Sequence, residues 1–251
     1  MISQEFYILD GEIRLHAKLD RPHDSSCALV LIVHGLTGHM EESFLIALQK
    51  ALNEAGFAVL RADLYGHGKS DGSFRDHTID QWVSNLTAVT EYAENLPFVT
   101  DLYLCGHSQG GLLAMMLAGM RPDDYQALIL LSPAVTIPEN ARNGNFLGIT
   151  FDPHNIPEDL EIWGSRLGSA YFRSAQQIHP EAYAQHFSKP VLIVHGEQDE
   201  LIPLESSIRA AVLYENCRLT VIEDDDHEYD VHPDMMCRAV TKFLQEQTDR
   251  S

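Results

Sequence analysis

The chain has 251 residues, of which 45% are hydrophobic, so it is long enough for one large α/β domain with a substantial buried core. Its formal net charge of −20, from 37 acidic and 17 basic residues, repels phosphate backbones and anionic lipid surfaces. The charge therefore argues against nucleic acid and membranes as partners and disfavours a highly anionic substrate.

The four cysteines are scattered and form no C-x-x-C pair, and three of them lie in or beside apolar runs. They are Cys27, Cys105, Cys217 and Cys237. This distribution predicts reduced core thiols in a cytoplasmic protein, not disulfides or metal ligands. No basic segment precedes an apolar run at the N-terminus, so no signal peptide is expected. No apolar stretch reaches the length of a membrane span.

The first half of the chain predicts a hairpin followed by strands that alternate with helices. Alternating apolar and polar residues on both sides of Asp10-Gly11 indicate a two-residue β-hairpin. Gly56 is suited to end a helix, and Thr78 can cap one that Pro97 stops. The expected strands are 6–9, 13–19, 28–33, 57–62, 101–105 and 127–131, and the expected helices are 42–55, 78–96 and 111–120.

The second half begins with a change of pattern. Between 134 and about 188, prolines, glycines and dispersed aromatic residues replace clean periodicity. Strands are then expected at 191–195 and 218–222, and helices at 204–214 and 235–247. Strands that alternate with helices predict a parallel sheet covered on both faces. We therefore expect a single domain over 1–251, with a lid inserted at about 134–188 above the binding crevice.

One stretch carries the clearest chemical signal. Residues 106–110, GHSQG, fit G-x-S-x-G, with an apolar strand before them and a helix of small and apolar residues after them. Such a tight turn strains the backbone of Ser108 and presents its hydroxyl in front of the sheet. Gly106 and Gly110 suit the close passage of strand and helix. A chance match to three fixed positions is the alternative, and the flanking strand and helix argue against it.

A nucleophilic serine needs a base and an orienting carboxylate, which on this kind of fold follow it in the order acid, then histidine. Asp199 follows the strand at 191–195 and is the expected acid, with Glu197 and Glu200 as weaker rivals. His227 follows the strand at 218–222 and is the only histidine in the right kind of loop. The predicted catalytic set is therefore Ser108, Asp199 and His227.

The oxyanion that forms when a serine attacks a carbonyl group needs amide donors close to the serine. The residue after the nucleophile, Gln109, supplies one expected backbone NH. The loop after the first buried strand, HGLTG at 34–38, supplies the other through Leu36.

The remaining histidines have simpler explanations. His34 and His107 are expected to make structural hydrogen bonds beside the site. His227 and His232 could be imagined as metal ligands, but no third ligand has fitting spacing, so no metal is expected.

These residues resemble the α/β-hydrolase superfamily and, more narrowly, the bacterial cinnamoyl (feruloyl) esterases. The similarity covers nearly the whole chain through HGLTGH, DLYGHGKSDG, GHSQGG, LSPA, GITFDPHNIP, YFRSAQQ and HGEQDELIP. The lid segments among these are the most specific, because lids vary between hydrolase families. The resemblance implies an α/β-hydrolase fold, with a mostly parallel central sheet, helices on both faces and a lid insertion.

In that family, polar lid side chains hold the phenolic hydroxyl of the substrate. By position, Tyr171 matches the family's lid tyrosine, although a packed aromatic residue is the alternative. Asn140 stands where relatives carry an aspartate, and Leu147 stands where they carry a glutamine. With His34 beside them, these residues are the expected substrate contacts.

The resemblance implies a serine esterase that cleaves ferulate, caffeate and coumarate esters through an acyl-enzyme, without a cofactor. Its expected partner is a small-molecule ester, and whether the chain forms a homodimer stays an open question. The alternative is a general carboxylesterase or monoglyceride lipase for short aliphatic acyl chains, with a wholly apolar lid pocket. A non-catalytic binding protein is disfavoured by the intact Ser108, Asp199 and His227. Dehalogenase or epoxide-hydrolase chemistry would need an aspartate where Ser108 stands.

Overall fold

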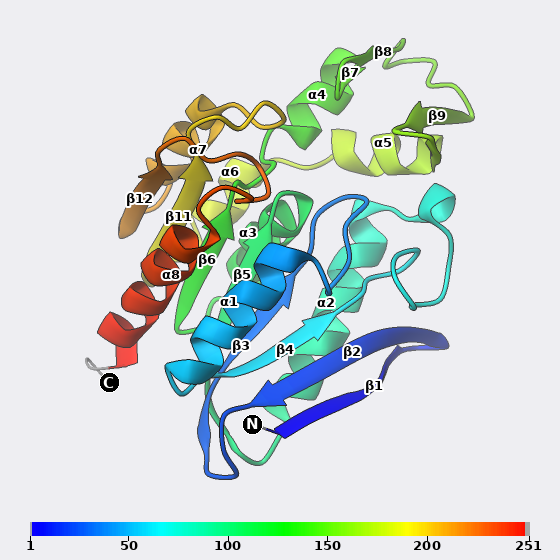
Figure 1. The fold of residues 1–251 in the computed structure, drawn as a ribbon. Coiled ribbons are helices and arrows are strands. Elements are labelled where there is room, and N and C mark those ends of the chain that lie inside the picture. Colours follow the sequence, from blue (N-terminus) through cyan, green and yellow to red (C-terminus); the bar gives the residue numbers. More distant parts are fainter. Residues whose placement is uncertain (1, 249–251) are drawn as a thin grey trace.

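The computed structural model describes residues 2–248 and shows a central sheet of eight strands with helices on both faces (Figure 1). Two antiparallel pairings, β1 with β2 and β2 with β4, form one edge, and the other pairings are parallel. This confirms the predicted fold class. Across the sheet, the strands are β1 (Ile2–Asp10), β2 (Ile13–Arg21), β4 (Ala58–Ala62), β3 (Cys27–Val33), β5 (Val99–His107), β6 (Ala127–Leu131), β11 (Val191–Gly196) and β12 (Cys217–Ile222).

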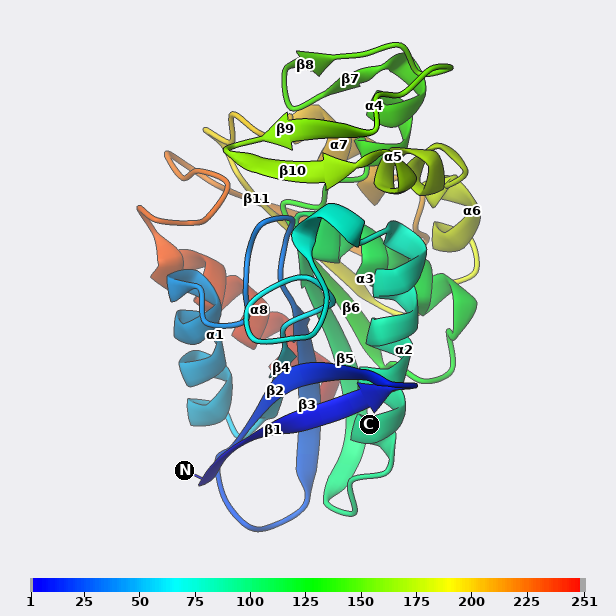
Figure 2. The same ribbon diagram turned by 90° about the vertical axis from the view of Figure 1, so that its right-hand side faces the viewer.

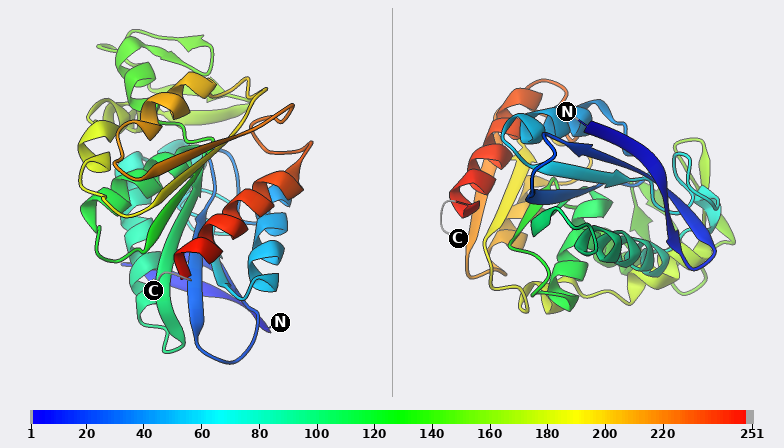
Figure 3. Two further views of the ribbon diagram at one scale, coloured as in Figure 1. Left: turned by 90° about the vertical axis from the view of Figure 1, so that its left-hand side faces the viewer. Right: turned by 90° about the horizontal axis from the view of Figure 1, so that it is seen from below.

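The helices divide the core into two layers (Figure 3). Side chains of β3 alternate between them: Leu31 packs with the layer under α2 and α3, and Ile32 packs with the layer under α1 and α8. α3 is apolar all round and buried along nearly its whole length, as its sequence predicts. The helices are α1 (Ser43–Glu54), α2 (Ile79–Glu94), α3 (Gln109–Met120), α7 (Leu204–Ala211) and α8 (Pro233–Thr248).

The segment 134–188 lies above the carboxyl ends of the parallel strands (Figures 1 and 2). It contains two small hairpins and three short helices, which the sequence pattern did not resolve because each strand has only two to four residues. The ring of Phe172 packs at 5.3 Å from those of both Phe146 and Tyr171. The elements are α4 (Ile137–Asn143), β7 (Asn145–Phe146), β8 (Ile149–Thr150), β9 (Asp159–Ile162), β10 (Ser165–Gly168), α5 (Ser169–Gln176) and α6 (Pro180–Ala184).

The same segment packs against the short 3-10 helix η1 (Phe74–Asp76), which lies outside it in the chain. The Arg75 guanidinium donates to Asp159 of β9 at 3.1 Å and to Glu158 at 2.6 Å. A Cβ on Gly168 would lie 2.5 Å from the Arg75 carbonyl, so β10 and η1 approach each other too closely for a side chain there. The segment is therefore docked along one side.

Element boundaries differ from the expected ones by a few residues. The hairpin turns at Gly11-Glu12, one residue later than expected, with Gly11 at φ +60°. Strand β5 extends to His107 and α3 begins at Gln109, so Ser108 alone separates them. As expected, Thr78 caps α2, accepting a hydrogen bond from the Gln81 amide at 3.1 Å. No helix within residues 2–248 is both long and apolar enough to cross a membrane.

Candidate active site

The turn between β5 and α3 holds Ser108 at φ 53° and ψ −120°, a left-handed conformation that costs free energy in any residue but glycine. Glycines make the turn sterically feasible. A Cβ on Gly106 would lie 2.1 Å from the Gly110 carbonyl oxygen, and one on Gly110 would lie 2.4 Å from the His34 carbonyl oxygen. Larger residues at either position would push strand and helix apart.

The strained serine is held by backbone hydrogen bonds. Its amide donates to the carbonyl of Leu131 at the end of β6 at 2.9 Å. Its own carbonyl accepts from Ala134, also at 2.9 Å, and from the amides of the first turn of α3. These bonds to neighbouring elements maintain the conformation that the isolated turn would not keep.

The structure brings the predicted acid and base together. The Nδ1 atom of His227 donates to Oδ2 of Asp199 at 2.6 Å. The other carboxylate oxygen of Asp199 accepts from the amides of Leu201 and Ile202 at 2.9 and 2.8 Å. Burial acts to raise the pKa of Asp199, but the bond to His227 and the Ile202 amide outweigh it, so the pKa lies below its usual value. Asp199 is therefore a charged, fully buried carboxylate that orients the imidazole.

The two rival acids lie elsewhere. The Glu197 carboxylate accepts the amide of Asp224 at 3.3 Å. Glu200 is exposed and lines the cavity mouth instead of meeting His227. Only Asp199 therefore has the geometry of the orienting carboxylate.

The loops that carry the acid and the base are bonded to each other. The amide of Gln198 donates to the carbonyl of Asp225 at 2.7 Å. A Cβ on Gly196 would meet the Asp226 carbonyl at 2.2 Å, so the loops touch through their backbones. This contact fixes the separation between Asp199 and His227.

Two buried histidines support the pair. His107 donates from Nε2 to the carbonyl of His227 at 2.8 Å, and its ring lies 4.7 Å from the His227 ring. Burial, then the nearby His227, lowers the pKa of His107 to about 3, so it is neutral. His195 donates from Nε2 to the Ile202 carbonyl at 2.9 Å, and that nitrogen lies 3.4 Å from Asp199. Through these bonds, the two histidines hold the backbone of the loops that carry the base and the acid.

The loop after β3 passes close to the serine. Its turn closes through a bond from the Gly38 amide to the Gly35 carbonyl at 3.2 Å, with Thr37 at φ 63°. A Cβ on Gly35 would lie 3.0 Å from that of Ser108, so a side chain there would crowd the nucleophile. Leu36 lines the cavity beside the serine.

Unlike Leu36, Gln109 is not among the residues that line the cavity. As the first residue of α3, its amide has no partner within the helix, because the first amides of a helix have no preceding turn to bond to. Its side chain is fully buried.

A cavity of about 380 Å³ opens beside the serine. Of the predicted residues, it is lined by Ser108, His227, Leu36, Asn140 and Leu147, with Asp199 buried behind His227. The remaining lining residues are Gly35, Thr37, Glu42, His107, Ala134, Thr136, Ile137, Asn145, Phe146, Gly148, Trp163, Glu200, Leu201, Ile202, Pro203 and Glu228.

Two expected substrate contacts do not reach this cavity. Tyr171 is fully buried, and its hydroxyl donates to Oε1 of Gln109 at 2.7 Å. His34 is also fully buried, donating from Nδ1 to the Gly35 carbonyl at 2.8 Å and accepting the Leu64 amide at Nε2 at 3.0 Å. Their polar atoms are already used within the protein. The prediction that they contact substrate is therefore corrected: both sit behind the residues that face the cavity.

Sequence reasoning missed several cavity residues. Asn145 and Trp163 lie in the irregular segment. No sequence pattern marked them as cavity residues, apart from their closeness in the chain to Asn140 and Leu147. Glu42 and Glu228 offered a weak signal, since each borders a loop that carries a predicted site residue. Their arrival at one cavity depends on tertiary structure.

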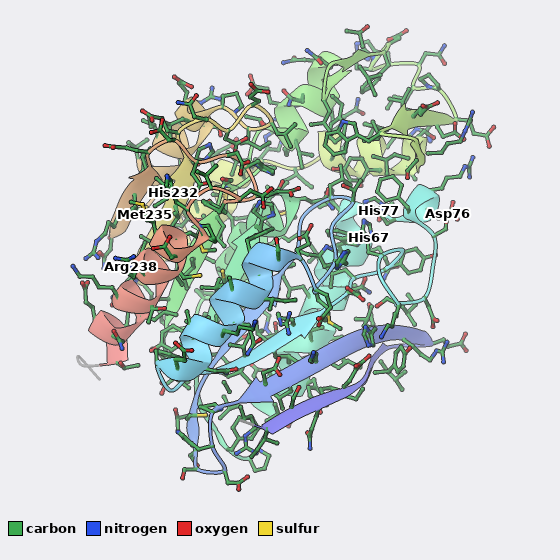
Figure 4. All side chains as sticks on the ribbon, viewed as in Figure 1. His67, Asp76, His77, His232, Met235 and Arg238 are labelled. Atoms are coloured by element: carbon green, nitrogen blue, oxygen red, sulfur yellow. The ribbon has the colours of Figure 1, made fainter. Side chains whose placement is uncertain are left out.

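Several histidines lie away from the cavity. Figure 4 shows His232 at the start of α8, while His67 and His77 lie on the opposite side of the molecule. The latter pair packs with ring centroids 5.1 Å apart, and burial lowers the pKa of His67 to about 2 and that of His77 to about 4. Within residues 2–248, no group of three His, Cys, Asp or Glu side chains could hold a metal ion.

Comparison with known proteins identifies both family matches and a relative that covers nearly the whole chain. Residues 24–154 match a family described as serine aminopeptidase, S33, and residues 93–236 match one described as putative esterase. The structure of Est1E from Butyrivibrio proteoclasticus with ferulic acid bound is 50% identical, with a TM-score of 0.96, over 97% of this chain and 99% of that one.

Curated relatives are more distant. Lipase LipV of Mycobacterium tuberculosis is 38% identical over 125 residues, which are 50% of this chain and 44% of that protein. The mitochondrial palmitoyl-protein thioesterase ABHD10 of Rattus norvegicus is 23% identical over 72% of this chain and 62% of its own length. The chain thus spans less than two thirds of the length of these curated relatives. From the family matches and the likeness to Est1E, we conclude that the chain belongs to the α/β-hydrolase superfamily and, within it, to the carboxylic ester hydrolases.

Proposed function

We propose that this protein is a serine esterase that hydrolyses hydroxycinnamate esters, such as those of ferulate, caffeate and coumarate, through a triad of Ser108, His227 and Asp199. The observation that carries the proposal is the cavity lined by Ser108 and His227, with Asp199 bonded to His227 at 2.6 Å. The likeness to Est1E with ferulic acid bound supports the acyl group.

The geometry supports a two-step reaction. His227 takes the proton of Ser108 as the hydroxyl oxygen attacks the ester carbonyl, while Asp199 stabilises the imidazolium that forms. The amides of Leu36 and Gln109 are the proposed donors to the oxyanion. His227 then protonates the departing alcohol, and water, activated by the same imidazole, releases the acid from the acyl-enzyme. These groups suffice without a cofactor.

The acyl group is proposed to lie against the wall supplied by the segment 134–188, which would then act as the lid of a single domain. That wall combines apolar side chains such as Phe146 and Leu147 with the amides of Asn140 and Asn145. We propose that Asn140 bonds the phenolic hydroxyl. Tyr171 and His34 act indirectly, through Gln109 and the loop after β3.

The test of this function is a comparison of acyl groups. The kcat/KM should be higher for methyl p-coumarate than for methyl cinnamate, and Asn140→Ala should reduce that preference. A protein that prefers methyl butyrate over both would be the aliphatic carboxylesterase or monoglyceride lipase, a candidate that the apolar Leu147 and the likeness to lipase LipV support. Inactivity of the wild type on all three esters would rule out both functions.

We also propose a cytoplasmic location and a homodimer. The location is supported by four free cysteines, three of them buried. The homodimer is supported by three exposed apolar side chains: Ile208 on α7, Val212 directly after it and Val221 on the edge strand β12. Light scattering of the purified protein measures the assembly state, and cell fractionation measures the location.

A further inference from the structure

The cavity has two chemically different walls. Every lining residue from the segment 134–188 is uncharged. The opposite wall, built from loops at the carboxyl ends of the strands, carries the carboxyl groups of Glu42, Glu200 and Glu228. No lysine or arginine stands among the described residues that line the cavity. We call this second surface the acidic wall.

The three carboxyl groups differ in burial. Glu200 and Glu228 are exposed at the cavity mouth. Glu42 lies deeper, and its Oε2 atom is buried without a hydrogen-bond partner in the described part of the chain. Burial, then the charges of Glu228 and Asp63, raises the pKa of Glu42 to about 8. Near pH 7, the charge of the acidic wall therefore comes from Glu200 and Glu228.

The reaction places the alcohol half of the ester against this wall. The departing alcohol oxygen must take its proton from His227, so it faces that side chain. Glu228 follows His227 directly in the chain, and Glu200 follows Asp199, the partner of His227. With the acyl group against the uncharged wall, the substituents of the alcohol project toward the two carboxylates.

Building on the proposed function, we propose that Glu200 and Glu228 select the alcohol half of the ester by its charge. A cationic alcohol is favoured over a neutral one of the same shape, and an alcohol that carries a carboxylate is disfavoured. Coulomb's law for unit charges about 8 Å apart in water gives somewhat more than a twofold effect per charge, so two carboxylates together give about fivefold.

Two pairs of substrates isolate charge from shape. The first pair is choline ferulate and 3,3-dimethylbutyl ferulate, which differ by a quaternary nitrogen in place of carbon. The second pair is chlorogenate and its methyl ester, which differ by one carboxylate. At low ionic strength and pH 7, we expect kcat/KM to be about fivefold higher for the choline ester and about fivefold lower for chlorogenate. Both ratios should approach one in 0.5 M NaCl, because salt screens exposed charges.

The double variant Glu200→Gln with Glu228→Gln should bring both ratios close to one at low salt. The matched control is Glu54→Gln with Glu215→Gln, which removes the same charge from exposed residues near the opposite end of the sheet. If the control changes the ratios as much as the double variant does, net charge and not the acidic wall is responsible.

Wild-type ratios near one at low salt would overturn the inference even if the double variant failed to fold. Failure of the proposed function has a different signature, because the neutral 3,3-dimethylbutyl ferulate would then not be cleaved at all.

Discussion

At the scale of single residues, the site depends on the backbone angles of Ser108 and on a few polar side chains that are partly or fully buried. Ser108 combines a left-handed backbone with bonds to two neighbouring elements. Tyr171 is fully buried and bonds to Gln109, the residue after the nucleophile, and Glu42 is half-buried and lines the cavity. Each makes a prediction that separates a catalytic role from a structural one.

For Ser108, the predicted strain gives two variants different stabilities. Both Ser108→Ala and Ser108→Gly should lower kcat by at least about 10⁴-fold, because each removes the nucleophile. Only glycine relieves the left-handed conformation, so Ser108→Gly should be more stable than Ser108→Ala by roughly 1–2 kcal/mol in urea unfolding. Equal stabilities would show that the backbone at this position is not strained.

For Tyr171, the bond to Gln109 predicts an effect that does not depend on the substrate phenol. Tyr171→Phe leaves a buried acceptor of Gln109 unpaired and should destabilise the protein by about 1–2 kcal/mol. Rates with p-coumarate and cinnamate esters should fall by the same factor. The control is Tyr214→Phe, which removes a buried hydroxyl without a partner in the described chain and should cost little stability. A selective loss on p-coumarate would instead restore Tyr171 as a substrate contact.

For Glu42, the raised pKa predicts how stability depends on pH. The folded protein holds an extra proton between the ordinary value of 4.5 and about 8, so the free energy of unfolding falls as the pH rises through this window. Glu42→Gln removes this dependence. We expect the variant to be more stable than the wild type by roughly 1–2 kcal/mol at pH 8.5, with the difference vanishing near pH 4.5.

Urea unfolding at pH 4.5, 7 and 8.5 measures the Glu42 effect, with the exposed Glu54→Gln as control. A difference that stays constant with pH would show that Glu42 titrates normally.

At the scale of elements, the active-site residues sit in loops whose shapes are set by hydrogen bonds to the backbone. In the loop between β12 and α8, Oδ1 of Asp225 accepts the amides of Asp226 and Val231, each at 3.1 Å. Oδ1 of Asp226 accepts the amides of Glu228 and Asp230, also at 3.1 Å. Two carboxylates of the acidic run before His227 thus fold the loop that presents it.

The loop bonds predict that Asp226 acts on catalysis without touching substrate. Asp226→Ala frees the amides of Glu228 and Asp230, which follow the base directly in the loop, so we expect kcat to fall by about tenfold with KM nearly unchanged. Glu223→Ala, at an exposed position of the same loop, should leave both parameters near wild type. Asp226→Asn keeps an acceptor oxygen and should recover part of the lost rate. A pure stability loss with normal kcat would argue that the loop shape does not control His227.

At the scale of the whole molecule, the fold brings loops from distant parts of the chain together at the carboxyl ends of the parallel strands. The elbow after β5, the loop after β3 and the loops after β11 and β12 meet there because parallel strands end on the same side (Figure 1). The whole molecule also carries the net charge of −20.

The net charge predicts a response to salt. Self-repulsion destabilises a compact, highly charged state, so screening should stabilise it. We expect the melting temperature at pH 7 to rise by a few degrees between 10 mM and 300 mM NaCl, where the Debye length falls from about 30 Å to below 8 Å. The rise should shrink at pH 5, where part of the carboxylates are protonated. An unchanged or lower melting temperature at pH 7 would show that the charges are spread too far apart to matter.

Local patterns in the sequence were enough to predict the layers of the fold. Buried strands such as 127–131 are continuous apolar runs, and α1 shows its period, so composition and spacing alone mark them. The elbow was also readable, because G-x-S-x-G between a strand and a helix describes a local backbone. The choice of Asp199 and His227 as candidates followed from their place after strands.

Contacts between distant segments were decided only by tertiary structure. Tyr171 and Gln109 are 62 residues apart. Neither local sequence predicts that the Tyr171 hydroxyl donates to the side-chain amide of Gln109. The strands of the segment 134–188 are too short to show a period, and Glu42 and Glu228 share a cavity through the folding of two separate loops. Sequence periodicity reports which face of an element is buried. Which residue packs against that face depends on how the sheet brings remote loops together.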